Sequence, residues 1–168
     1  PTAVQPGQGL ILISSNTESE VLVATLDHSG ASGEHRVYRV VSNGIGLNVL
    51  ELAPHHRSRA TVIMHHGLRD SAFALLPIAR QLSEHFHVLL PELRGHGRSD
   101  HSDAYGVYDF VLDLKEVAIA LAGQRIALFG HSLGGHIVSK YAAIFPEQVD
   151  AVAIVEGLGP PHRAHESN

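Results

Sequence analysis

The clearest chemical signal in this chain is a serine at position 132 set among glycines. Residues 130–134 read Gly-His-Ser-Leu-Gly, they follow the apolar run 126–129, and a helical pattern begins directly after the serine. A strand that turns abruptly into a helix needs small residues beside the turn, because the two elements approach closely there. The hydroxyl of Ser132 would then stand at the end of a strand, next to helix amides that stabilise negative charge. Ser132 is therefore the candidate nucleophile, and the alternative is a purely structural turn.

Two segments upstream of the serine extend this pattern. Residues 61–68 run from an apolar, β-branched stretch into His-His-Gly-Leu, and residues 91–100 read Pro-Glu-Leu-Arg-Gly-His-Gly-Arg-Ser-Asp. Together with the serine turn, they resemble the α/β-hydrolase superfamily, and the resemblance covers roughly residues 36–160. The first segment is similar to the family's third strand and its His-Gly oxyanion loop. The second is similar to the family's turn after the fourth strand.

The resemblance implies roles for two backbone amides. In this family the amide after the nucleophile, here that of Leu133, and one from the His-Gly loop, here that of Leu68, together bind the oxyanion. One position departs from the family pattern, because Glu92 stands where aspartate is usual. The glycines of that turn should still supply its backbone angles, whereas the hydrogen bonds of the carboxylate are left open.

The general base and the acid that such a serine needs are expected downstream. In α/β-hydrolases both follow the nucleophile along the chain, after the seventh and eighth strands. Here only residues 133–168 follow Ser132, and residues 149–155 read as the family's sixth strand. The sequence is therefore interpreted as the amino-terminal portion of a hydrolase, without the segment that completes the triad.

The residues that remain offer weak substitutes for the missing groups. Glu156 ends the last strand, where a minority of relatives carry the acid, and its alternative role is that of a solvated strand-end carboxylate. His162 and His165 lie in a polar, proline-bounded tail, which is a poor support for a base that must reach a hydroxyl. His131 adjoins Ser132 but is expected to pack or to bond to a loop.

The function implied is that of a serine hydrolase acting on an ester or related acyl substrate through an acyl-enzyme. A serine at this turn argues against epoxide hydrolases and haloalkane dehalogenases, which use aspartate there. Thioesterases, amidases, carbon–carbon bond hydrolases and cofactor-free haloperoxidases share the Gly-His-Ser-Leu-Gly-Gly pattern, so the reaction stays open within the class. The alternative is a catalytically incompetent fragment or pseudoenzyme that acts as a binding or interaction module. No cofactor is expected, and the expected partner is a small acyl substrate.

Composition favours a globular domain without nucleic acid or membrane partners. Of 168 residues, 44% are hydrophobic and 17% charged, which argues against disorder. The absence of cysteine excludes disulfides, and a net charge of −5 without a basic run gives no footprint for nucleic acid. The amino end has no basic leader, and the apolar run 10–13 is too short for a signal peptide or a membrane span, so the cytoplasm is the expected location.

Fourteen histidines raise the question of a metal site. Adjacent histidines on an extended segment point to opposite faces, and no carboxylate completes a ligand set at a familiar spacing. No functional metal is therefore expected. The histidine pairs considered are His55 with His56, His65 with His66, and His85 with His87.

Strands and helices alternate after an antiparallel start. The predicted strands are residues 21–26, 36–41, 47–52, 61–64, 86–90, 126–129 and 149–155, and the predicted helices are 71–84, 107–121 and 133–145. Asn43-Gly44 is a hairpin signal, and Ser71 is a plausible helix N-cap. This order predicts an α/β-hydrolase fold: a mostly parallel sheet with an antiparallel N-terminal hairpin, helices on both faces, and an incomplete C-terminal side.

The chain is divided into two parts. Residues 1–35 are expected to be an N-terminal extension that contains strands, and residues 36–168 a partial α/β-hydrolase core. If the last strand, 149–155, lies at the edge of the sheet, its unpaired backbone groups are a template for another copy of the chain. Self-association through that edge is therefore expected.

Overall fold

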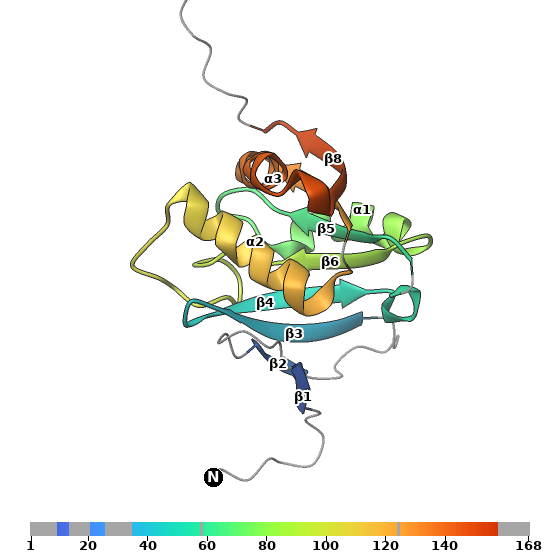
Figure 1. Ribbon diagram of the computed structural model, residues 1–168, viewed down its shortest axis with the longest axis horizontal. Helices are drawn as coiled ribbons and strands as arrows, with labels where there is room; N and C mark the ends of the chain where they lie inside the picture. The colour runs from blue at the N-terminus through green and yellow to red at the C-terminus, as the bar shows by residue number, and fades with distance from the viewer. Residues whose placement is uncertain (1–9, 14–20, 26–34, 58, 124, 158–168) are drawn as a thin grey trace, which may run out of the picture.

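A computed structural model describes residues 10–13, 21–25, 35–57, 59–123 and 125–157 (Figure 1). The described residues form eight strands, three α-helices and two short 3₁₀-helices. In chain order these are β1 (Leu10–Ile13), β2 (Val21–Thr25), β3 (His35–Ser42), β4 (Ile45–Leu52), η1 (Pro54–His56), β5 (Thr61–His65), α1 (Ala72–Ser83), β6 (His87–Pro91), α2 (Val107–Leu121), β7 (Ile126–His131), α3 (Leu133–Ile144), η2 (Pro146–Gln148) and β8 (Val149–Val155).

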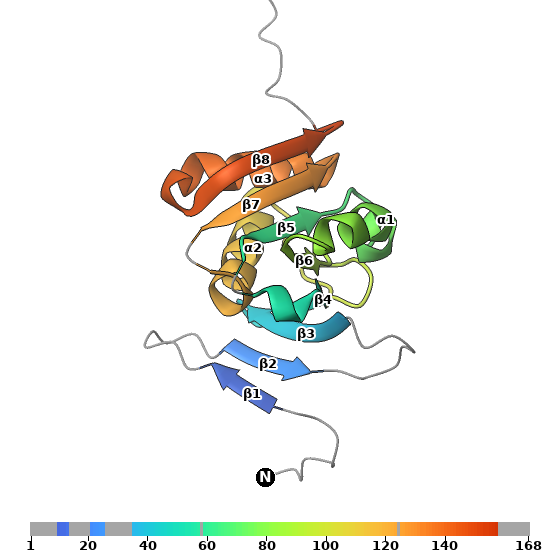
Figure 2. The ribbon, with the colours of Figure 1, turned by 90° about the vertical axis from the view of Figure 1, so that its right-hand side faces the viewer.

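All eight strands belong to one sheet, in the order β1-β2-β3-β4-β6-β5-β7-β8 (Figure 2). The strands β6, β5, β7 and β8 are parallel, whereas β1 to β4 pair antiparallel and β4 joins β6 antiparallel. The predicted fold class is confirmed. The antiparallel part is larger than the predicted hairpin, because β1 and β2 extend it beyond β3.

The β3–β4 hairpin has the predicted turn. Its register runs from His35 opposite Leu52 to Ser42 opposite Ile45. The two turn residues both have positive φ, 47° at Asn43 and 78° at Gly44, as a type I′ turn requires. The turn therefore fixes the register that carries β4 next to the parallel strands.

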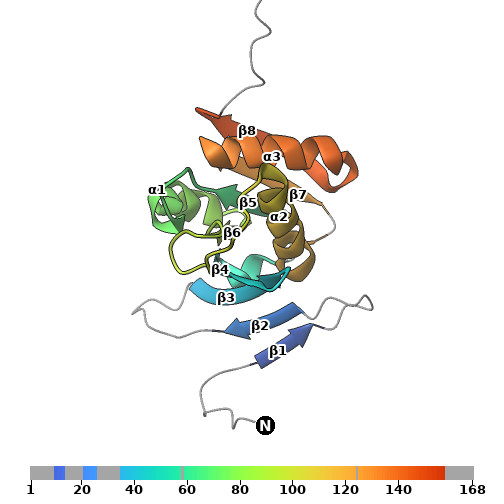
Figure 3. The ribbon, with the colours of Figure 1, turned by 90° about the vertical axis from the view of Figure 1, so that its left-hand side faces the viewer.

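Helices cover both faces of the sheet, and each face has its own apolar core (Figures 2 and 3). The helix α1 packs on one face over Val62, Met64, Val88 and Leu90. On the other face α2 and α3 pack together, and an apolar stripe on α2 is buried there. Its members are Phe110, Leu114, Val117 and Leu121.

Predicted and observed elements differ by a residue or two at their ends. Ser71 occupies the N-cap position of α1, but its side chain makes no capping hydrogen bond. The division at residue 35 stays a prediction, and the extension predicted for residues 1–35 lies outside the described residues except for β1, β2 and His35. Within the described part of the chain, no helix combines the length and the apolar character needed to cross a membrane.

Candidate functional site

The candidate nucleophile sits in a strained turn between β7 and α3. Ser132 has φ 52° and ψ −114°, a backbone region that non-glycine residues rarely adopt and that costs of order 1–3 kcal/mol. Two backbone hydrogen bonds hold it there: the Ser132 N–H donates to the Val155 carbonyl at 3.0 Å, and the His136 N–H donates to the Ser132 carbonyl at 3.2 Å. The strand-turn-helix context predicted for Ser132 is therefore the one observed.

The glycines on either side of the serine allow this turn to close. A Cβ atom on Gly130 would lie 2.5 Å from the Gly135 nitrogen, and one on Gly134 would lie 2.8 Å from the His66 carbonyl oxygen. Both separations are far shorter than any real contact between such atoms. Side chains at these two positions would push α3 away from β7 and β5, so small residues are a steric requirement.

The loop after β5 lies directly beside the nucleophile. A Cβ atom on Gly67 would be 3.2 Å from both the Ser132 Cβ and the His131 Nδ1, so the loop backbone passes next to the serine. The amide of Leu68 belongs to this loop, and that of Leu133 is the first of α3, where helix N–H groups have no partner within the helix. Both predicted oxyanion amides therefore belong to segments at the carboxyl end of the parallel strands.

Glu92 stands where the family usually has aspartate. Its carboxylate makes hydrogen bonds that the sequence analysis left open. Its buried carboxylate accepts hydrogen bonds from the Asn48 side chain at 3.0 Å, the Arg98 N–H at 2.8 Å and the Ala72 N–H at 3.4 Å. A Cβ atom on Gly97 would overlap this carboxylate, so the glycine makes room for the longer side chain. The longer acid thus links β4, the turn after β6 and the start of α1.

None of the described histidines hydrogen-bonds to the Ser132 hydroxyl. The His131 Nε2 lies 3.9 Å from a carboxylate oxygen of Glu156, which follows β8 with φ 49° and a side chain that is 84% exposed. Glu156 therefore lies at the same end of the sheet as Ser132. The histidine next to it is His131, which makes no hydrogen bond to the Ser132 hydroxyl. His162 and His165 lie outside the described residues.

His65, one of the histidines considered above for a metal site, is the last residue of β5 and pairs with Gly130 of β7. Its ring is buried, and neither ring nitrogen has a hydrogen-bond partner among the described residues. Burial, together with the neighbouring His66, lowers the pKa of His65 to about 3. Its position on β5, in alternation with the core residue Ile63, is the signal that predicts burial. No three histidine or acidic side chains of the described residues gather as a metal site.

A second buried polar cluster lies at the opposite end of the parallel strands. The Glu51 carboxylate accepts hydrogen bonds from the Tyr38 hydroxyl (2.8 Å), Arg57 Nε (2.6 Å) and His87 Nε2 (2.7 Å), and the other nitrogen of His87 lies 3.0 Å from the Thr61 hydroxyl. Burial alone would raise the pKa of Glu51, but the hydrogen bonds outweigh it and bring the pKa to about 2. This network is far along the strands from Ser132.

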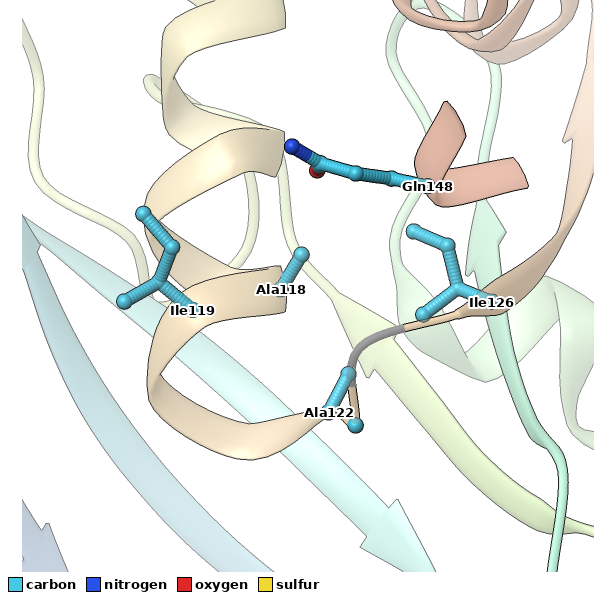
Figure 4. Close-up of a pocket in the computed structure, with 6 residues that line it drawn as sticks. Ala118, Ile119, Ala122, Ile126 and Gln148 are labelled. Atoms are coloured by element: carbon cyan, nitrogen blue, oxygen red, sulfur yellow. The ribbon is translucent and has the colours of Figure 1, made fainter. Parts of the chain in front are cut away.

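An open depression of about 440 Å³ also lies at that opposite end (Figure 4). It is formed by the last turn of α2, the start of β7 and η2, and the Gln148 side chain reaches across it toward α2. Because β7 begins here and ends at His131, directly before Ser132, the depression is separate from the candidate site. Its lining residues are Ala118, Ile119, Ala122, Gly123, Ile126 and Gln148.

Comparisons of the sequence and of the structure with known proteins point to the same family. Residues 60–168 match the family described as alpha/beta hydrolase fold. A human serine hydrolase-like protein is 30% identical over 98 residues, which cover 56% of this chain and 48% of that protein. The crystal structure of a membrane phospholipase A, a bacterial virulence factor, superposes with a TM-score of 0.70 at 30% identity, covering 75% of this chain and 41% of that one.

Epoxide hydrolase A from Mycobacterium thermoresistibile superposes with a TM-score of 0.66 at 27% identity, and the match covers 70% of this chain and 38% of that one. An uncharacterized protein of Mycobacterium tuberculosis is 27% identical over 141 residues, which are 83% of this chain and 37% of that protein. The chain thus spans less than half the length of these relatives. The strained serine turn, the sheet order and the match over residues 60–168 agree, and the chain belongs to the α/β-hydrolase fold family.

Proposed function

We propose that this chain forms the nucleophile half of a serine hydrolase that cleaves esters or related acyl compounds. The observation that carries the proposal is the backbone of Ser132, whose φ of 52° presents a hydroxyl at the carboxyl end of the sheet beside the Gly67 loop. Backbone strain that the surrounding structure maintains is typical of functional sites. The relatives named as a serine hydrolase-like protein and a phospholipase support the same class of reaction.

The proposed reaction has two steps. The Ser132 oxygen attacks the acyl carbon while a general base takes its proton, and the carbonyl oxygen becomes an oxyanion that accepts hydrogen bonds from the Leu68 and Leu133 N–H groups. Collapse expels the leaving group, which takes the proton from the base, and leaves an acyl ester on the serine. Water then attacks this ester by the same route and releases the acid. The base and its acid partner would come from residues other than those described.

Ester chemistry fits this chain better than epoxide opening, although epoxide hydrolases share the fold. In the epoxide hydrolases of this family an aspartate occupies the elbow and attacks the epoxide to form an ester that water can cleave. A serine that opened an epoxide would leave an ether, which water does not cleave under these conditions. Ser132 therefore favours acyl transfer, because an acyl-serine is an ester that turns over.

Replacement of the nucleophile tests the proposal. In the full-length protein, Ser132→Ala should lower the hydrolysis of short p-nitrophenyl esters by several orders of magnitude, since the remaining amides alone give only residual catalysis. Ser83→Ala is the matched control, because among the described residues that hydroxyl bonds only to the Arg80 carbonyl, at an exposed position of α1. Activity that survives Ser132→Ala would exclude the serine from the mechanism. A wild-type protein inert toward all acyl substrates would favour the non-catalytic module instead.

A further inference from the structure

We propose that His66 and His96 act together as positioning residues that aim the Leu68 N–H at the oxyanion. The inference rests on the proposed serine hydrolase function and names two side chains that would set the geometry of its oxyanion loop. Both imidazoles bond to the backbone of residues 67–69, and their rings lie 5.3 Å apart between centroids. They come from different segments, one at the end of β5 and one in the turn after β6.

The first imidazole holds the peptide group that contains the Leu68 amide. The Gly67 carbonyl oxygen lies 2.8 Å from His66 Nδ1, and it also accepts the Asp70 N–H at 3.3 Å. The Gly67 carbonyl and the Leu68 N–H belong to the same planar, trans peptide group and point in opposite directions. Holding the carbonyl on one side therefore fixes the direction of the N–H on the other.

The second imidazole holds the next region of the loop. The Arg69 N–H donates to His96 Nε2 at 3.2 Å, and Arg69 has φ 63°, a left-handed conformation that glycine or asparagine would adopt more readily. The Gly67-to-Asp70 hydrogen bond with positive φ at Arg69 describes a type II turn. The contact with His96 thus stabilises a turn that its own sequence does not favour.

The partners of each ring determine where its proton sits. His66 Nε2 accepts the Leu93 N–H at 3.1 Å, so the proton must be on Nδ1, from which it is donated to the Gly67 carbonyl. By the same reasoning His96 Nε2 accepts from Arg69, so Nδ1 is protonated and donates to the Arg94 carbonyl at 3.0 Å. Both rings are therefore neutral in the Nδ1–H form. Burial lowers the pKa of His66, which favours this neutral form.

Substitution of the accessible imidazole tests its role in turnover. In the full-length protein, His96→Phe removes the acceptor and should lower kcat for p-nitrophenyl esters at least tenfold with little change in KM, because the oxyanion forms only after binding; complete loss of one oxyanion donor costs about 10²–10³. His96→Gln keeps an acceptor oxygen near the Nε2 position and should restore kcat to within about threefold. His85→Phe, at the other end of the sheet, is the matched control.

Nitrogen NMR of histidine tests the geometry without any turnover. In ¹⁵N-histidine-labelled protein at pH 8, the signals that disappear in His96→Gln should show a protonated Nδ1 and an unprotonated Nε2. The inference is overturned by a protonated Nε2 at His96, or by His96→Phe with wild-type kcat. If the wild type hydrolyses no ester while the NMR shows the Nδ1–H form, the positioning geometry stands and the proposed function fails. If the ester is hydrolysed but the tautomer is wrong, the positioning role fails alone.

Discussion

The two ends of the parallel strands are built in opposite ways. At the carboxyl end, Arg69, Ser132 and Glu156 all have positive φ, and the buried ring of His65 has no hydrogen-bond partner among the described residues. At the amino end, the polar groups around Glu51 are paired with one another, and both nitrogens of the buried His87 have partners. Ala53 is the one described non-glycine residue of positive φ at that end, and the His56 Nδ1 is the buried ring nitrogen there that has no partner among the described residues.

This contrast indicates how the fold divides stability and chemistry. Strain at Ser132 is confined to the turn between β7 and α3, and it persists because the surrounding backbone hydrogen bonds and close glycine contacts hold the turn in place. The satisfied network at the opposite end joins β4, β6 and β5 through Glu51, His87 and Thr61. We infer that the paired end stabilises the sheet against which the strained end is held.

The largest effect on activity and stability is expected from a methyl group added at Gly134, near the strained Ser132. Gly134→Ala would place a Cβ atom against the carbonyl groups of His65 and His66, so α3 must shift away from β5. Activity should fall more than 100-fold, and the free energy of unfolding should fall by about 3 kcal/mol, which is the upper end of what overpacking typically costs. Gly123→Ala meets nothing within 4 Å and serves as the control in urea unfolding. Equal stability of the two variants would remove the steric argument for the elbow.

A substitution of Glu51, at the amino end of the parallel strands, should cause a comparable loss of stability without a loss of catalytic activity. Glu51→Gln removes the charge that His87 and the partly exposed Arg57 contact, and hydrogen bonds to a charged group contribute about 1.5–3 kcal/mol. Urea unfolding of this variant should show that loss, while kcat per folded molecule stays near wild type. Glu84→Gln, on the exposed surface, is the control.

The Glu51 carboxylate also makes the free energy of unfolding depend on pH, and the direction of this dependence follows from its pKa. Its pKa is about 2 in the folded protein against an ordinary 4.5, so the unfolded chain binds more protons between these values. The stability from Glu51 is present above pH 4.5 and is lost as the pH falls toward 2. The Glu51→Gln variant should lack this part of the acid sensitivity, and an identical acid profile in both proteins would contradict the network.

A smaller effect, of opposite sign, is expected from the unpaired imidazole. His65→Leu replaces a buried polar ring with an apolar side chain of similar size, which should raise the free energy of unfolding by about 1–2 kcal/mol at pH 7. The pKa of His65 is about 3 in the folded protein against an ordinary 6.5, so wild-type stability rises with pH across this window. The gain from His65→Leu should therefore be larger at pH 5 than at pH 7. A destabilised variant at both pH values would show that the ring has a structural partner.

The smallest effect concerns the edge of the sheet. In the described structure β8 is an edge strand, and Val152, Ile154 and Val155 are 40–48% exposed. We propose that the 168-residue polypeptide associates through this edge at micromolar concentration, because unpaired apolar strands pair with copies of themselves. Val152→Lys should shift light scattering toward monomer. A wild-type polypeptide that is already monomeric would contradict the proposal.

Local features of this fold could be predicted from the sequence, and long-range pairings could not. Turn chemistry at Asn43-Gly44 and the Gly-His-Ser-Leu-Gly turn depend on neighbouring residues, so their conformations follow from residue type. The meeting of Glu51, His87 and Thr61 depends on the strand order β4-β6-β5, which differs from the chain order. The contacts of Glu92 and His96 likewise join segments 20 to 44 residues apart. Nothing in the local pattern specifies those partners.

The proposed role of Ser132 as the nucleophile has one direct test. The full-length protein is treated with a fluorophosphonate, and the modified peptide is identified by mass spectrometry. One adduct per molecule is expected, located on Ser132 and absent from Ser132→Ala. A folded wild-type protein that stays unlabelled, or an adduct on any other residue, would contradict it.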